Sequence, residues 1–279
     1  MPMRKKKTLA LAILAVLVLV YIGAATLLAL RNDPIAILEK PPTCCESIMI
    51  FGASGTAGDG ILKAALASPD IKKIHVITRR PTPRIDQGVA AGKVRMTLHQ
   101  DYLDYTAIED QMRSVDAVFW AIGISTFSVD EKTYGTIHVD FPASFVTKWL
   151  SVSDRPAPSF HYISSSDISA DSTAMWAREK VRAEQTLFGL AEGTKLRVLA
   201  YRPDYIGPTE EEAHLGQRML YGFFAPIGAA VKAEQIGKAM IEVSARSGEF
   251  ANGDKLGTRT IIRYGDALDR RHTSAGRGP

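Results

Sequence analysis

A glycine-rich segment, "IMIFGASGTAGDG", has the spacing of a loop that holds a phosphate group. Gly52, Gly55 and Gly58 follow the pattern G-x-x-G-x-x-G between a run typical of a buried strand and one typical of a helix. The first glycine permits a tight turn, the second lets the backbone approach a pyrophosphate, and the third allows close helix packing. Free N–H groups at the helix N-terminus attract phosphate oxygens. We therefore predict a dinucleotide site formed by Gly52, Ser54, Gly55, Thr56, Ala57 and Gly58.

Two arginines at the end of the next expected strand bear on which dinucleotide binds. That strand, "KIHVITRRP", should end beside the adenosine ribose, where NAD-specific sites usually carry Asp or Glu. Arg79 and Arg80 stand there instead, with Arg84 close behind. A guanidinium matches a 2′-phosphate in charge and forked geometry, so NADP(H) is favoured over NAD(H). The alternative is a solvated basic turn without a ligand.

Three residues near the ends of later strands are expected to complete this site. Asp101 follows the third strand and is expected to face the adenine amino group. Gly123 ends the fourth strand, where it would clear space for the diphosphate and ribose, and Ala121 lies in the same strand end. A glycine triplet alone also fits a plain turn, but its position at the first strand of an alternating domain favours the cofactor.

These residues need a scaffold of parallel strands, and the chain has the matching pattern. Short β-rich runs alternate with longer helical stretches, which predicts a parallel sheet covered on both faces. We expect an α/β fold, a Rossmann-like doubly wound parallel sheet, with an N-terminal transmembrane helix. The expected strands lie at 47–53, 73–79, 94–100, 116–123, 160–166 and 196–202.

A long apolar run precedes the expected sheet. Residues 8–30 contain no charge over 23 positions, and about 20 apolar residues suffice to cross a bilayer. Four basic residues at 4–7 precede the run, so the positive-inside tendency places the N-terminus in the cytosol. We therefore expect a single-pass membrane protein. The alternative is a cleaved signal peptide, whose apolar region is usually about 7 to 15 residues long.

The chain divides into four expected parts. Residues 1–32 form the membrane anchor, and 33–45 form a tether in which prolines break any helix. Residues 46–265 form the NAD(P)-binding Rossmann domain with a small C-terminal substrate region, and 266–279 form a loose polar tail.

Charge and cysteine content exclude several classes of partner. The basic residues before the apolar run equal the whole net charge of +4, and no element carries a stripe of Lys and Arg, so nucleic acid is not expected. Cys44 and Cys45 are adjacent, which disfavours a disulfide, and are interpreted as linker thiols. The six histidines lack metal-ligand spacing, so no metal is expected, and His99, His138 and His161 are expected to be packed in buried elements.

Five segments resemble, in chain order, the atypical branch of the short-chain dehydrogenase/reductase superfamily: the glycine loop, "AIGIS", "YISSSD", a helix with Lys180, and "YRPDYIG". The resemblance spans about 47–241 and is to the NAD(P)H-binding, epimerase-like proteins of the Tat-interacting tumour-suppressor type. It implies that Ser165, with Ser166 as the alternative, polarises a substrate carbonyl. It also implies that Lys180 bonds the nicotinamide ribose and lowers the pKa of a proton-passing tyrosine. Lys180 also fits a charged helix face, paired with Glu184.

The position of that tyrosine is occupied by Trp176, four residues before Lys180 in "STAMWAREKVRAEQT". An indole N–H only donates, whereas a general acid must give up and regain a proton. Trp176 is therefore expected either to line the pocket near the nicotinamide or to pack its helix onto the sheet. Tyr134 is our first candidate for the substitute proton donor, and Asp167 and Glu179 are weaker candidates.

The segment after the sixth strand, 215–231, is rich in apolar residues and has two interpretations. It forms either an apolar lid beside a membrane, which would suit a lipophilic substrate, or part of the core. The core is favoured, because apolar side chains at helical spacing normally face inward. The next stretch, 231–245, predicts an amphipathic closing helix with Ile236, Ala239, Met240 and Val243 inward.

Two functions fit these observations. The first is a membrane-anchored NADP(H)-dependent oxidoreductase acting on a small or lipophilic carbonyl compound, with Ser165, Lys180 and Tyr134 at its centre. The second is a non-catalytic NADP(H)-binding regulator or assembly factor, which the tryptophan at position 176 favours. Sugar-nucleotide chemistry is a smaller possibility, because no uridine-binding element is evident and the C-terminal part is short for it.

Overall fold

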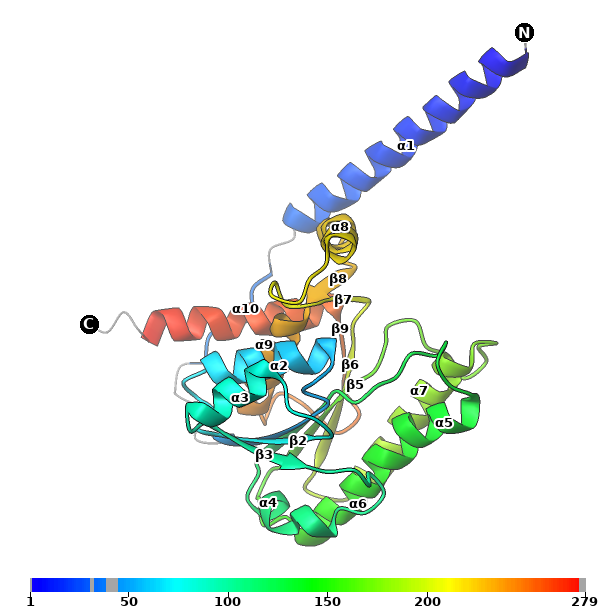
Figure 1. Cartoon of the computed structure of the whole chain (residues 1–279). Helices are drawn as coiled ribbons and strands as arrows, with labels where there is room; N and C mark the ends of the chain where they lie inside the picture. Colours follow the sequence, from blue (N-terminus) through cyan, green and yellow to red (C-terminus); the bar gives the residue numbers. More distant parts are fainter. Residues whose placement is uncertain (1, 31–32, 39–44, 276–279) are drawn as a thin grey trace.

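A single sheet of seven parallel strands forms the centre of the computed structural model, which describes residues 2–30, 33–38 and 45–275 (Figure 1). The strand order is β3-β2-β1-β4-β5-β6-β9, so the order reverses between β1 and β4. Ligands of doubly wound sheets bind at such a switch point, outside the carboxyl ends of the strands. The strands are β1 (Ser47–Phe51), β2 (Lys73–Thr78), β3 (Val94–Leu98), β4 (Ala117–Trp120), β5 (Ser159–Ile163), β6 (Arg197–Arg202) and β9 (Lys255–Gly257).

The predicted α/β fold and all six expected strands are confirmed. Successive side chains of a strand point to opposite faces, so a strand covered on both faces is a continuous apolar run. Along β1, Ile48 and Ile50 enter one apolar layer, whereas Met49 and Phe51 enter the other. This double burial explains why the strands could be found in the sequence.

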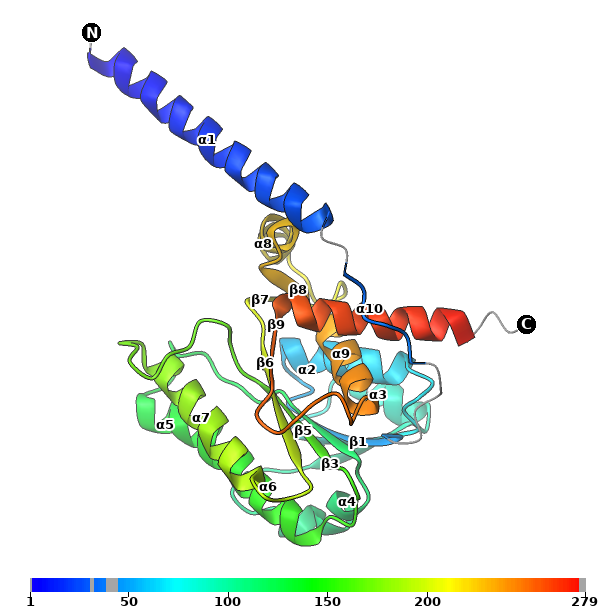
Figure 2. The same cartoon turned by 180° about the vertical axis from the view of Figure 1, so that it is seen from behind.

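Helices cover both faces of the sheet (Figures 1 and 2). One layer includes side chains of α2 (Thr56–Ala67), α3 (Pro83–Ala90), α9 (Ala233–Ala245) and α10 (Thr258–Ala275). The other includes side chains of α4 (Glu109–Arg113), α6 (Phe141–Val152) and α7 (Met175–Ala191). The inward face predicted for 231–245 is confirmed in α9, since Ile236, Ala239, Met240 and Val243 are fully buried.

Three short strands were not predicted from the sequence. β7 (Tyr205–Gly207) and β8 (Ala230–Lys232) form a separate parallel pair, and β9 extends the main sheet beside β6. Each contains only three residues, which is too short for an alternating pattern to be recognised.

The helix between β7 and β8 corrects the favoured interpretation of the segment 215–231. α8 (Leu215–Phe224) has no buried residue, and Leu215, Met219, Leu220 and Phe223 are exposed. The expectation that this segment belongs to the core is therefore wrong for α8, although Ala230 and Val231 at its end are buried. Helical spacing predicts that the helix has an apolar face. It does not predict whether that face packs against the body of the protein or points away from it.

The N-terminal helix α1 (Pro2–Leu30) projects from the body near α8 (Figures 1 and 2). Its segment Leu11–Leu28 is long and apolar enough to cross a membrane, and none of its residues is buried. The described part of the tether, 33–38, lies against the body, because Arg263 binds Asp33 and Arg270 donates to the Ile35 carbonyl. Residues 31–32 and 39–44, which include Cys44, lie outside the described residues.

Two further expectations need correction. Residues 266–275, expected to be loose, form the second half of α10, where Ala267, Leu268 and Arg271 are buried. Arg271 binds the fully buried Glu242 at 2.8 Å, so an apparently polar tail contributes to the interior. Cys45 is also buried and donates to the Ser244 carbonyl, which places it in the folded domain rather than in a linker.

Candidate functional site

The glycine loop connects β1 to α2 at the switch point of the sheet. Gly52 has φ +78°, and a Cβ there would lie 2.5 Å from the Ala121 carbonyl carbon. A Cβ on Gly58 would overlap the Gly52 carbonyl oxygen, whereas a Cβ on Gly55 would find its nearest neighbour at 3.5 Å. The outer two glycines therefore permit close backbone contact, and the middle one borders the cavity just before the helix N-terminus, where a phosphate would bind.

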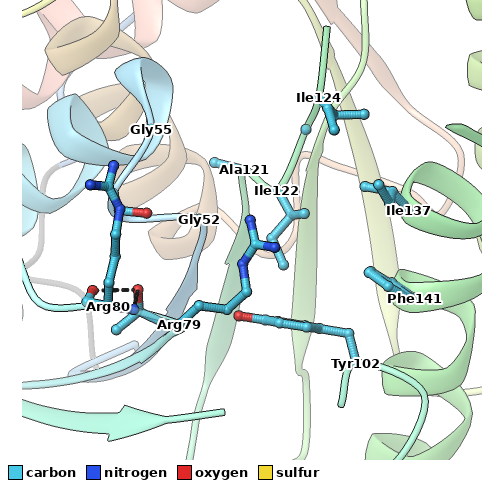
Figure 3. Close-up of a pocket in the computed structure, with 13 residues that line it drawn as sticks. Gly52, Gly55, Arg79, Arg80, Tyr102, Ala121, Ile122, Ile124, Ile137 and Phe141 are labelled. Atoms are coloured by element: carbon cyan, nitrogen blue, oxygen red, sulfur yellow. Dashed lines mark hydrogen bonds between the residues drawn. The ribbon is translucent and has the colours of Figure 1, made fainter. Parts of the chain in front are cut away.

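A cavity of about 300 Å³ opens in front of this loop (Figure 3). It lies at the carboxyl ends of β1, β2 and β4. Seven of the predicted cofactor residues line it, namely Gly52, Ser54, Gly55, Arg79, Arg80, Ala121 and Gly123. Thr56, Ala57 and Gly58 lie beyond the lining in the first turn of α2. The structure thus brings together residues from three separate strand ends.

The arginines after β2 differ in what they are free to bind. Arg79 and Arg80 are exposed and reach toward the cavity from the end of the strand (Figure 3). Arg84, by contrast, binds the buried Asp59 at 2.7 Å, and Thr209 donates to the same carboxylate. Arg79 and Arg80 are therefore the guanidinium groups available to an anion in the cavity, while Arg84 holds α3 against α2.

Tyr102, rather than Asp101, lies beside the cavity on the third strand's side. The Asp101 carboxylate accepts a hydrogen bond from the Leu103 N–H at 2.9 Å and so closes a turn. Tyr102 lines the cavity and stacks on Phe141 with ring centroids 5.4 Å apart. Its aromatic character could have been noticed in the sequence, but its neighbour's carboxylate was the more obvious polar candidate.

Lys180 is buried behind the end of β5. Its Nζ donates to the Ile163 carbonyl at 2.8 Å and to the Tyr162 hydroxyl at 3.3 Å, and that hydroxyl donates to the His138 carbonyl at 3.2 Å. Burial lowers the pKa of Lys180 to about 7, although Glu184 opposes the shift. The alternative pairing of Lys180 with Glu184 is not found among the ion pairs of the described residues. The Glu184 carboxylate binds Arg202 instead.

Tyr134 and His138 form an aromatic pair next to this lysine. Their ring centroids are 4.1 Å apart, and His138 accepts a hydrogen bond from the Ile124 N–H at 3.4 Å. Burial raises the pKa of Tyr134 to about 12 and lowers that of His138 to about 2. His138 lies in a π-helical turn, η2 (Thr136–Asp140), a rare geometry that often marks functional sites.

The expected burial of His99, His138 and His161 is confirmed. No sequence signal predicted the π-helical turn, which explains why His138 was interpreted only as a packed residue.

The serine triplet after β5 shows three degrees of burial. Ser164 is buried and its Oγ has no hydrogen-bond partner among the described residues, whereas Ser165 is half-buried and Ser166 is exposed. A buried polar atom without a partner usually awaits a ligand or a water molecule. The Ser164 hydroxyl is therefore a further candidate donor, which the sequence analysis did not identify.

Trp176 lies in the first turn of α7, one helical turn before Lys180, and is half-buried. It therefore shares a helix face with the lysine. The weaker proton-donor candidates are differently placed, since Glu179 binds Arg182 and Asp167 is exposed. The described residues contain no cluster of His, Cys, Asp and Glu that could hold a metal ion.

A second cavity of about 400 Å³ lies beneath α8. Tyr221 of α8 closes over Gly207 of β7, and a Cβ on that glycine would meet the tyrosine ring at 2.6 Å. The cavity is lined by Gly207, Pro208, Glu210, Ala213, Gln217, Arg218, Tyr221 and Lys232.

Comparison with known proteins supports the fold. No family model matches the chain. The chain is 27% identical over 177 residues to the leucinostatins biosynthesis cluster protein T of Purpureocillium lilacinum, a match that covers 62% of each protein. Because that share is below two thirds of the relative's length, the match does not assign an activity.

Solved structures with the same architecture include a 3-oxoacyl-[acyl-carrier protein] reductase from Brucella melitensis in complex with NAD, at TM-score 0.59 and 17% identity over 79% of this chain and 98% of that one. BdcA in complex with NADPH has TM-score 0.58 and 15% identity over 76% and 92%. UDP-glucuronic acid 4-epimerase from Bacillus cereus has TM-score 0.58 and 12% identity over 76% and 77%. The chain therefore has the Rossmann-like fold that these dehydrogenases/reductases and the epimerase share.

Proposed function

We propose that this protein is a membrane-anchored, NADP(H)-binding oxidoreductase that acts on a small or lipophilic carbonyl compound. The observation that carries the proposal is the cavity of about 300 Å³, in which the glycine loop faces Arg79 and Arg80. At Gly52 and Gly58 a Cβ would clash with backbone atoms, and Gly55 borders the cavity. These features suit a pyrophosphate at the helix N-terminus and a 2′-phosphate at the end of β2.

The exposed arginines favour NADP(H) over NAD(H) for an electrostatic reason. A 2′-phosphate carries negative charge and accepts forked hydrogen bonds from a guanidinium, whereas the 2′-hydroxyl of NAD(H) gains little from it. Arg84 does not compete for this role, because its guanidinium is bound to Asp59.

The proposed chemistry needs a carbonyl donor and a proton donor from the chain, while a bound nicotinamide supplies or accepts the hydride. Ser165 would polarise the carbonyl, with the unpartnered Ser164 as a second donor. Tyr134 would pass the proton; burial raises its pKa to about 12, so the transfer requires a bound ligand to bring that pKa down toward the working pH. Lys180 would reach the ribose by exchanging its bond to Tyr162.

A second function is favoured by one observation. Trp176 occupies the helix face beside Lys180, where the resemblance implies a tyrosine, and an indole does not supply a transferable proton. A protein that binds NADP(H) without turnover, as a regulator or assembly factor, would tolerate that residue.

Separate titrations of NADPH and NADH into the full chain in detergent micelles test the cofactor proposal, with nicotinamide fluorescence and thermal melting as readouts. We expect NADPH to bind more tightly and to raise the melting temperature. Failure of both dinucleotides to bind contradicts both functions.

The two functions are separated by a carbonyl-substrate screen with the wild type and with Trp176→Tyr. Turnover by the wild type supports the enzyme. Turnover by the variant alone supports a non-catalytic binding protein in an otherwise complete site.

A further inference from the structure

The outward face of α8 carries a row of exposed apolar side chains. Leu215, Met219 and Phe223 recur at intervals of four residues, with Leu220 beside them, and Met219 is 69% exposed. Met219, Leu220 and Phe223 also line a shallow apolar hollow on this face. Apolar side chains gathered on one exposed face mark an interaction surface rather than an ordinary solvated helix.

This face adjoins the N-terminal helix directly. The Tyr21 ring of α1 stacks on Phe223 with centroids 5.4 Å apart, and its hydroxyl donates to the Phe223 carbonyl at 2.7 Å. Both views of the molecule show α8 beside the body-proximal end of α1 (Figures 1 and 2). The apolar surface of α8 is therefore continuous with the unburied surface of α1.

The position of Tyr21 along α1 indicates how deep in a bilayer its contact with Phe223 would lie. Tyr21 lies nine residues before Leu30, the last residue of the helix. At about 1.5 Å per residue, that separation is about 14 Å along the helix axis. A hydrocarbon core is about 30 Å thick, so with Leu30 at its edge and α1 upright the contact lies within the core, below the headgroups.

The charged groups near α8 have partners: Arg218 of α8, which is exposed, donates to the Glu210 carbonyl. Glu210 binds Lys232, and Glu211 binds Lys63, each at 2.9 Å. Glu210 and Lys232 line the cavity beneath α8, on its inner side. The tether also fixes the end of α1 to the body, because Arg263 of α10 binds Asp33 just beyond that end.

We propose that the outward face of α8, formed by Leu215, Met219, Leu220 and Phe223, is inserted among the acyl chains of the leaflet that α1 crosses. This inference rests on the proposed membrane anchor. The same helix covers the cavity of about 400 Å³ with its inner face, through Tyr221 over Gly207. Insertion of α8 would therefore place that cavity next to the bilayer.

Depth-dependent fluorescence quenching tests the insertion. In a Cys44→Ser, Cys45→Ala background, the full chain would carry a single NBD-labelled cysteine at Met219→Cys and be reconstituted into phosphatidylcholine vesicles containing doxyl-labelled acyl chains. Leu14→Cys in α1 reports on the anchor, and Val89→Cys in α3, also exposed, serves as the matched soluble control. Near-ultraviolet circular dichroism confirms that each labelled chain is folded.

We expect the probe at 219 to be quenched about twofold or more above the probe at 89, and to a similar extent as the probe at 14, since both would contact acyl chains. Quenching at 14 with none at 219 overturns the insertion and leaves the anchor intact. Absence of quenching at both positions overturns the anchor itself and the insertion with it.

Discussion

Arg79 and Arg80 decide the predicted cofactor preference. Replacing both with Ala is expected to weaken NADPH binding about tenfold to a hundredfold, because hydrogen bonds to charged groups contribute about 1.5–3 kcal/mol. NADH binding should change little, since its ribose carries no phosphate. Arg113→Ala, on the surface of α4, is the matched control and should affect neither affinity. An equal loss for both dinucleotides in the titration would contradict a 2′-phosphate site.

Lys180 makes the stability of the protein dependent on pH. Burial lowers its pKa from 10.5 to about 7, so between these values the folded protein holds the neutral amine while the unfolded chain binds the proton. The unfolded state then binds more protons, and the free energy of unfolding rises with pH across this window. Below about pH 7 both states are charged and the cost of burying the ammonium is at its greatest.

Comparison with Lys180→Met isolates this effect. The variant lacks the titrating group, so the wild type should gain stability relative to it as the pH rises from 7 to 10 in urea titrations. Parallel stability curves for the two proteins would show that the amine titrates normally.

Among the structural elements, α2 and α9 pack closely at glycines. A Cβ on Gly237 would lie 2.7 Å from the Ile61 Cα, which is backbone and cannot move aside. Gly237→Ala should therefore lower the free energy of unfolding by about 1–2 kcal/mol, because overpacking exceeds the gain of about 1 kcal/mol in helix propensity. Gly189→Ala in α7, where no atom lies within 4 Å, should instead stabilise the protein. Urea denaturation of both variants checks the opposite signs.

The elements that could be predicted from the sequence are those whose signal lies within one continuous segment of the chain. The glycine loop and the six long strands have motifs and apolar runs within one segment of chain. The contact of Lys180 with Tyr162, and of Tyr162 with His138, joins α7, β5 and η2, so no local pattern could reveal it. The exposed face of α8 was wrongly assigned to the core, because spacing does not indicate which neighbour a helix face meets.

At the scale of the whole molecule, the contacts between α1 and the body bear on whether α1 is retained or cleaved. Tyr21 lies in the segment that a signal peptidase would remove, and it contacts Phe223 of α8. Cleavage would therefore break a stacked ring pair and a hydrogen bond of 2.7 Å. It would also leave the apolar face of α8 without its neighbour. These contacts favour retention of α1, in agreement with an apolar run longer than that of a signal peptide.

We therefore expect the protein purified from cells to retain its N-terminal residues and to stay in the membrane pellet after carbonate washing at high pH. The physical reason is that an uninterrupted apolar helix is held by the hydrocarbon core rather than by charge, so alkaline treatment does not release it. Replacing Leu14 and Leu17 with Arg is the matched test, since each charge at the centre of a spanning helix costs about 2.5–3.5 kcal/mol. That variant should move to the supernatant with its N-terminus intact. Intact-mass measurement of the wild type provides the decisive observation, because a chain beginning after the apolar run would identify a cleaved signal peptide and remove the basis for a membrane-bound lid.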